Sequence, residues 1–282
     1  MEALYIHGAS AYFGEAHRDM ALLKEEIRRH TQENFRRSNR FILLSLLGAR
    51  QCVGRQALAA DTAIYLTTER GNLSETVTVL DEIYASHSLP KPFGFINTMS
   101  GTAAFYLAQN LGIQGRSIIL SSRRTGFERG LELLRTDFAL GVETGALIGG
   151  VDEVSPEEEE LGKRRGWTAV DGSGWLYLRT ERQGACGAVR ENRAFADGRS
   201  LVQWLKQRQG PPADMAAFGA GIAAADAAAL RDALGPAALF NTLQECGYSG
   251  SATACAIALF VRRFPGRTLW HLNQDGRGRF TL

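Results

Sequence analysis

The sequence predicts an α/β protein built from packed layers. Short apolar runs typical of buried strands alternate, in both halves of the chain, with longer segments of helical periodicity. Glycine and proline residues separate these segments. This alternation is typical of sheets covered by helices. With 282 residues, 45% of them apolar, the chain is long enough for one large core or two closely packed ones.

In the first half, strands are expected where a short apolar run lies between turn residues, at residues 3–6, 63–66, 117–120 and 146–148. Helices are expected where apolar residues recur at helical spacing, at residues 36–56, 73–86, 100–111 and 125–138. Asn72 is a helix cap, Pro90 follows a helix, and Gly112 ends one.

The second half repeats the alternation. Strands are expected at residues 174–179, 184–191 and 237–241, and a terminal hairpin at 268–272 and 279–282. Helices are expected at 201–207, 223–234 and 252–263. The charged residues 157–165 indicate a solvated loop or helix end, and residues 219–224, G-A-G-I-A-A, fit a dinucleotide fingerprint only weakly. A glycine turn between strand and helix in both halves suggests an internal duplication.

Charge and cysteine content exclude several classes of function. The net charge of +2 indicates neither nucleic acid nor an anionic membrane as a partner. No apolar run reaches the roughly 18 residues that span a bilayer, so we expect a cytoplasmic protein with no membrane span. The four cysteines are Cys52, Cys186, Cys246 and Cys255. Their spacing matches neither a metal site nor a disulfide framework, so neither a metal nor a cofactor is indicated.

The stretch from residue 115 to residue 153 holds the most informative feature, a strand, a sharp turn, a helix and a second strand. We call the turn, residues 121–124 (S-S-R-R), the elbow. At such a position free backbone N–H groups can stabilise a developing negative charge, and enzymes often place a nucleophile there. The alternative is a solvated arginine pair at the unfavourable end of the helix dipole, offset by Glu128 one turn later.

Four segments together resemble the β-ketoacyl synthase family. They are R-R-S-N-R at 36–40, residues 95–115 from F-I-N-T-M to G-I-Q-G, the elbow stretch ending in G-G-V-D-E, and D-G-S-G-W-L-Y-L at 171–178, which is similar to the family's E-G-A-G-x-L-V-L strand. The resemblance implies a thiolase-like layered αβαβα fold with two pseudo-duplicated halves. These would be residues 1–155 and a trimmed second half, 156–282, in one compact unit.

The resemblance also implies that the catalytic groups of the family are missing. Counting back from Gly149 by the family's spacing puts Arg124 where the acyl-accepting cysteine belongs. Tyr248 takes the histidine position of G-H-x-x-G-A-A-G, another histidine has no clear match, and the late G-F-G-G loop reads N-Q-D-G-R-G from Asn273. A guanidinium stays protonated and cannot form a thioester. The pattern is similar to the chain length factors of aryl polyene and type II polyketide systems.

A chain length factor is the inactive partner of a catalytic ketosynthase. By resemblance, the partners expected are that ketosynthase in a heterodimer, an acyl carrier protein and the growing acyl or polyene chain. The residues expected at the dimer interface are Ser117, Ile118, Ile119 and Leu120. Those expected to line the acyl tunnel and set chain length are Met99, Thr102, Phe105 and Tyr106. Arg124, held by Glu128 or another nearby carboxylate, is expected to plug or brace the unused site.

Two alternatives stay open. The chain could itself be an acyltransferase or ketosynthase that uses another thiol, such as Cys255, although a cysteine in an apolar helix is more often a small core residue. It could also be a scaffold or acyl-carrier docking protein without any role in a tunnel.

Overall fold

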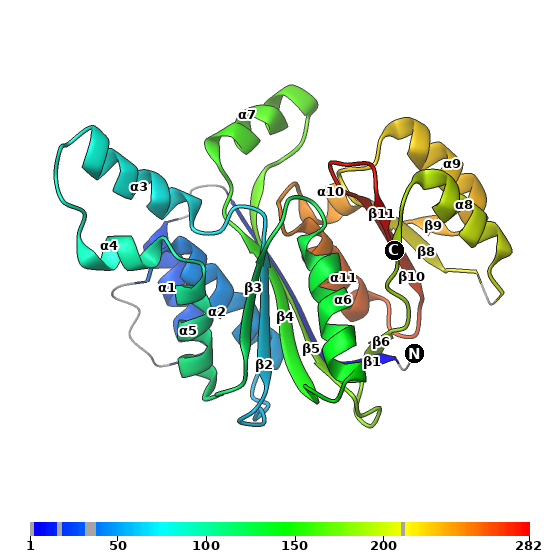
Figure 1. The fold of residues 1–282 in the computed structure, drawn as a ribbon, viewed down its shortest axis with the longest axis horizontal. Coiled ribbons are helices and arrows are strands. Elements are labelled where there is room, and N and C mark those ends of the chain that lie inside the picture. Colours follow the sequence, from blue (N-terminus) through cyan, green and yellow to red (C-terminus); the bar gives the residue numbers. More distant parts are fainter. Residues whose placement is uncertain (1–2, 16–18, 32–37, 210–211) are drawn as a thin grey trace.

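Two β-sheets with helices between and outside them form the molecule (Figure 1). The computed structural model describes residues 3–15, 19–31, 38–209 and 212–282. The first sheet contains β1 (Leu4–Glu15), β2 (Ala63–Thr68), β3 (Ser117–Ser121), β4 (Gly145–Asp152), β5 (Val170–Arg179) and β6 (Gly187–Val189). The second contains β7 (Ala194–Phe195), β8 (Met215–Phe218), β9 (Ala238–Leu239), β10 (Leu269–Gln274) and β11 (Phe280–Thr281).

The two sheets repeat one topology. Without β6, the first sheet has the order β3-β2-β4-β5-β1, and the second has the order β9-β8-β10-β11-β7. In both, the first three strands of that order are parallel and the next strand is antiparallel to its neighbours. The strands of the second sheet are shorter, in line with a trimmed second half.

The sheets do not divide at the sequence boundary expected after residue 155. Strand β5 follows that boundary but lies inside the first sheet, between β4 and β1. The change from one sheet to the other comes between Val189, the last residue of β6, and Ala194, the first of β7. A long antiparallel pairing with β1 and β4 holds β5 in the first sheet.

Helices complete a five-layer αβαβα arrangement, which is the one that the family resemblance implies. Helices α2 (Arg40–Val53) and α5 (Gly101–Leu111) cover one face of the first sheet, and α6 (Gly126–Ala139) and α11 (Ala252–Arg263) lie side by side in the middle layer. Helices α8 (Gly198–Gln207) and α9 (Ala224–Leu234) cover the outer face of the second sheet. Four clusters of buried apolar side chains lie at the successive layer contacts, and apolar burial of this kind is the main force that holds layers together.

Two local predictions were wrong. The strand expected at residues 3–6 does not end at Ile6: β1 continues to Glu15, with an irregularity in its pairing to β5 between Ile6 and Gly8. The charged residues 157–165 lie in a full helix, α7 (Pro156–Arg165), because Ser155 and Glu158 form a capping box at its start. Within the described part of the chain, no helix is both long and apolar enough to cross a membrane.

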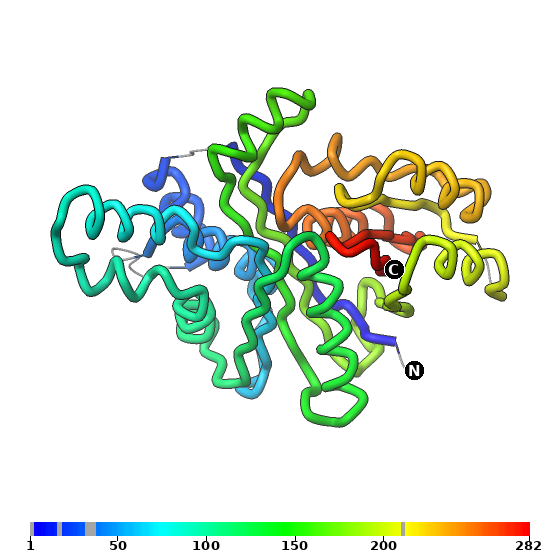
Figure 2. Tube along the Cα trace, turned by 45° about the horizontal axis from the view of Figure 1, so that its top comes forward, coloured from blue at the N-terminus to red at the C-terminus, as the bar shows by residue number. Residues whose placement is uncertain are grey.

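The remaining helices are α1 (Met20–Arg28), α3 (Leu73–Tyr84), α4 (Pro92–Asn97) and α10 (Thr242–Cys246). Helices α3 and α4 project from the body on the side of the β3 edge (Figure 1). The N- and C-terminal ends lie on the opposite side (Figure 2).

Candidate functional site

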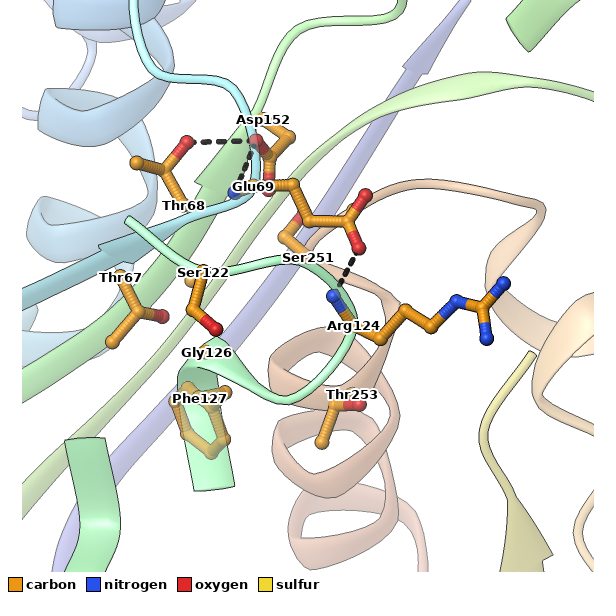
Figure 3. Close-up of a pocket in the computed structure, with 12 residues that line it drawn as sticks. Thr67, Thr68, Glu69, Ser122, Arg124, Gly126, Phe127, Asp152, Ser251 and Thr253 are labelled. Atoms are coloured by element: carbon orange, nitrogen blue, oxygen red, sulfur yellow. Dashed lines mark hydrogen bonds between the residues drawn. The ribbon is translucent and has the colours of Figure 1, made fainter. Parts of the chain in front are cut away.

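The candidate site lies where the duplicated halves meet. The parallel strands β2 and β4 end at the same edge of the first sheet, and the elbow follows β3 at that edge. The N-terminal ends of the two middle helices, α6 and α11, reach the same point (Figure 3). Their side chains enclose a small cavity lined by Thr67, Thr68, Glu69, Ser122, Arg124, Gly126, Phe127, Gly150, Asp152, Gly250, Ser251 and Thr253.

The elbow holds Arg124 in a left-handed backbone conformation, with φ of 66°. A residue with a Cβ rarely adopts this conformation, which costs about 1 to 3 kcal/mol. Both backbone polar groups of Arg124 are bound: the N–H donates to the Glu69 carboxylate, and the carbonyl accepts from Asn273 Nδ2 at 2.8 Å. These contacts from β10 and from the end of β2 fix the strained turn.

The Arg124 side chain does not fill the cavity. It points away from Asp152 and Glu69 (Figure 3), and it is exposed. Its aliphatic part runs past Gly221, where an added Cβ would lie 3.2 Å from Arg124 Cδ. The predicted plug is therefore wrong, and Glu128 does not hold Arg124. The two side chains form no ion pair, because the Glu128 carboxylate is buried whereas the Arg124 side chain is exposed. The carboxylate that binds Arg124 is that of Glu69, and it accepts from the backbone N–H.

Glu128 lies below the elbow in a buried polar network. Its Oε1 accepts hydrogen bonds from Asn273 Nδ2 at 2.8 Å and from Thr253 Oγ1 at 3.1 Å. Burial raises the pKa of Glu128 to about 7, although these bonds favour the charged form. His271 Nδ1 lies 3.9 Å from the same oxygen, and burial lowers the pKa of His271 to about 4, so its ring is neutral at pH 7.

Asp152 forms the opposite wall of the cavity. Its Oδ1 accepts from Thr68 Oγ1 at 2.7 Å and from the backbone N–H groups of Glu69 at 2.9 Å and Arg70 at 3.1 Å. Burial nevertheless raises the pKa of Asp152 to about 8. A Cβ on Gly250 would lie 2.7 Å from Asp152 Oδ2, so only glycine allows this approach.

The cavity is too small for a substrate. Its volume is about 10 Å³, which holds about one water molecule. An acyl chain or a thioester would need many times this space. In the conformation described, the elbow is therefore closed to the substrates of a condensing enzyme.

None of the cysteines lies at the elbow. Cys52, Cys246 and Cys255 are buried, and burial raises the pKa of each thiol, that of Cys246 to about 12. Cys186 is exposed, and partial burial of its sulfur still raises its pKa. Because the thiolate is the nucleophile, these environments argue against Cys255 as an acyl acceptor.

Tyr248 lies in the loop before α11. Its ring packs on that of Trp167, with 4.6 Å between ring centroids, and its backbone pairs with Thr168 and Val170. Burial raises the pKa of Tyr248, with a further contribution from Glu69. Three residues were predicted to stand at catalytic positions of the family: Arg124, Tyr248 and Asn273. Arg124 and Asn273 are joined by a hydrogen bond, whereas the Tyr248 ring packs on Trp167.

Sequence reasoning missed the acids and the glycine loop of this site. Glu69 directly follows β2, and Asp152 is the last residue of β4. Polar residues at the ends of two parallel strands were an available signal. Gly219 and Gly221 belong to the weak dinucleotide fingerprint. Their role is close packing, because an added Cβ would lie 2.1 Å from Asn273 Oδ1 and 2.3 Å from the Gln274 carbonyl oxygen, respectively.

The predicted tunnel and interface residues lie on the surface around β3. Phe105 is 64% exposed and Met99 52% exposed, while Thr102 and Tyr106 are half-buried. On β3, an edge strand paired only with β2 among the described strands, Ser117 is exposed and Ile118, Ile119 and Leu120 are half-buried. Their roles in a tunnel and an interface stay predictions.

Comparison with known proteins identifies the fold. No protein-family model and no curated protein matches the sequence. Among solved structures, the ishigamide ketosynthase/chain length factor is similar over 99% of this chain and 98% of its own, with a TM-score of 0.75 and 16% identity. The chain has the thiolase-like fold.

Other structures with the thiolase-like fold agree. The 3-oxoacyl-(acyl carrier protein) synthase III of Pseudomonas aeruginosa is similar over 99% of this chain and 96% of its own, with a TM-score of 0.61 and 17% identity. A ketosynthase in complex with its chain length factor from Xenorhabdus doucetiae is similar over 70% of this chain and 85% of the matched chain, with a TM-score of 0.51 and 16% identity. At these identities the likeness concerns the thiolase-like fold, and function must be argued from the site.

Proposed function

We propose that this protein is a chain-length-factor-like subunit that pairs with a separate catalytic ketosynthase and performs no condensation itself. The observation that carries the proposal is the elbow: Arg124 occupies its strained turn, and the adjoining cavity holds about one water molecule. A condensing enzyme needs a nucleophile and room for an acyl chain at one point. In this chain Arg124 stands at the turn, and the adjoining cavity has no room for an acyl chain.

The surface beside β3 supports pairing with another subunit. β3 has one free edge among the described strands, and a free edge can add a strand from a partner. On the same side of the molecule (Figure 1), most of the large exposed apolar side chains among the described residues lie between residues 77 and 105. They are Val77, Leu80, Ile83, Tyr84, Leu89, Phe93, Phe95, Ile96, Met99 and Phe105. An exposed apolar surface of this extent is typical of a protein interface.

The partner proposed is a ketosynthase served by an acyl carrier protein. Similar structures include a ketosynthase in complex with its chain length factor and a type II acyl carrier protein in complex with its ketosynthase. Because Phe105 is exposed beside β3, its ring would reach across an interface built on that edge. There it would limit the length of a growing chain in the partner's tunnel, since added carbons would meet a close-packed wall.

The test is co-expression with a candidate ketosynthase that has an intact elbow cysteine. We expect co-purification in a one-to-one complex, and longer products when Phe105 is replaced by alanine. The control is Leu140→Ala, at an exposed apolar residue at the end of α6, outside the proposed interface. Failure to co-purify with every cysteine-bearing candidate tried, or product lengths unchanged by Phe105→Ala, would count against the proposal.

A further inference from the structure

The first sheet has a second open edge, at β1, which the proposed function does not use. β1 pairs with β6 only at Leu4, Tyr5 and Ile6. From Gly8 to Glu15 it pairs with β5 on one side and with no described strand on the other. Natural sheets usually protect such an edge with lysine or proline. β1, L-Y-I-H-G-A-S-A-Y-F-G-E, has neither.

A groove lies along this edge. It has a volume of about 590 Å³ and is open to solvent, and it is distinct from the small cavity at the elbow. Its floor includes Ala9, Ala11 and Phe13 of β1, whose small or apolar side chains leave the strand accessible. A groove beside a free strand edge fits an extended peptide, because backbone hydrogen bonds bind its main chain and the groove accepts alternate side chains.

The rim of the groove is polar and basic. His30, at the end of α1, and Gln51, in α2, line it from one face of the sheet, and Arg262, in α11, lines it from the other. None of the described residues that line the groove is acidic. Arg262 is exposed and forms no ion pair with any residue in the described ranges. Since opposite charges steer association, the rim favours an acidic segment.

We propose that the β1 edge and this groove bind an extended acidic peptide segment of a partner protein by strand addition. A second copy of this chain is the less suitable occupant, because edge-to-edge pairing would bring two basic rims together. The inference does not depend on the role proposed for the β3 edge, which lies at the far side of the same sheet.

The probe is a fluorescein-labelled peptide of alternating valine and glutamate, about eight residues long, which spans roughly 26 Å when extended. Fluorescence anisotropy with the full chain measures its affinity. We expect saturable binding, and binding at least about tenfold weaker when lysine replaces glutamate or when Arg262→Glu reverses the rim charge. Arg263→Glu is the matched control, because Arg263 lies outside the groove and pairs with Glu245.

Strand addition has a signature that side-chain docking lacks. Only alternate amides of the peptide face β1, so N-methylation of one alternate set should abolish binding and N-methylation of the other should leave it unchanged. Hydrogen exchange at the amides of residues 8–15 should slow when the peptide binds. The proposal is overturned by no saturable binding, by equal binding of the lysine peptide, by equal effects of the two N-methylated sets, or by full affinity in Arg262→Glu.

Discussion

Asn273 Nδ2 donates a hydrogen bond to the backbone carbonyl of Arg124 at 2.8 Å, and thereby ties the end of β10 to the elbow. The same amide group donates to Glu128 Oε1 at 2.8 Å, and Asn273 Oδ1 accepts from the N–H of Gln274. One buried carboxamide thus holds the turn from the second half of the chain. Its amide group also donates to two acceptors, the Glu128 carboxylate and the Arg124 carbonyl, neither of which can donate a hydrogen bond to the other.

Asn273→Asp should destabilise the protein strongly. The substitution removes both amide donors and places a second carboxyl group beside buried Glu128. We expect a loss of about 2 to 4 kcal/mol of unfolding free energy. Urea denaturation at neutral pH measures it. The control is Asn192→Asp, at a half-buried asparagine that donates a hydrogen bond to the Glu128 carbonyl. Equal losses in the two variants would contradict the role given to Asn273.

Arg124→Gly should be neutral or stabilising, whereas Arg124→Val should destabilise. Glycine adopts φ of 66° without strain, while a β-branched residue resists it, so the two variants should differ by about 1 to 3 kcal/mol. The comparison isolates the backbone, because both variants lose the guanidinium. Arg123 does not have a positive φ, so there Arg123→Gly should be less stable than Arg123→Val. The same order at both positions would refute the strained elbow.

The stability of the protein should fall between about pH 6.5 and about pH 8.5. Burial raises the pKa of Glu128 to about 7 and that of Asp152 to about 8, so both groups favour folding while protonated and lose that contribution as pH rises through these values. The lowered pKa of His271 reduces the stability of the protein only below about pH 6.5, which lies outside this range. We expect a decrease of about 3 kcal/mol, measured by urea denaturation.

Glu128→Gln and Asp152→Asn together should flatten this pH dependence, since neither replacement ionises. Glu132→Gln, on the exposed side of the same helix as Glu128, is the control and should leave the slope unchanged. A slope that survives the double substitution would show that other groups titrate on unfolding.

Gly149→Ala should destabilise by about 2 to 4 kcal/mol through overpacking. A Cβ at this position would lie 2.3 Å from Trp175 ring atoms in the buried face between β4 and β5. Gly101→Ala is the matched control, because nothing lies within 4 Å of its added Cβ. Thermal unfolding compares the two, and a Gly149→Ala variant as stable as Gly101→Ala would contradict the packing described.

Arg124→Cys should not produce condensing activity. A thiol at the elbow would still face a cavity of about 10 Å³, with Tyr248 packed on Trp167. The assay is decarboxylative condensation with acyl and malonyl carrier-protein substrates, and intact mass reports any acyl adduct. Measurable turnover by this single variant would overturn the proposed non-catalytic role.

The layered fold and most of its elements were predictable from the sequence because their signals are local. A short apolar run such as residues 63–66 predicts a strand that is buried on both faces. The helical periodicity of residues 252–263 predicts a helix whatever its place in the fold. The continuation of β1 past Gly8 was not predictable in this way. Its pairing with β5 depends on residues far along the chain.

The sequence by itself determined that an arginine stands at a sharp turn between strand and helix, followed by a glutamate one turn later. Only the tertiary structure decided where their polar groups point. Asn273, on a strand of the second half, and Thr253, on a helix of that half, bind Glu128 Oε1 in a buried network, whereas the Arg124 side chain is exposed. A side chain's partner in a buried site is set by groups that converge from distant segments, and spacing along the chain does not contain that information.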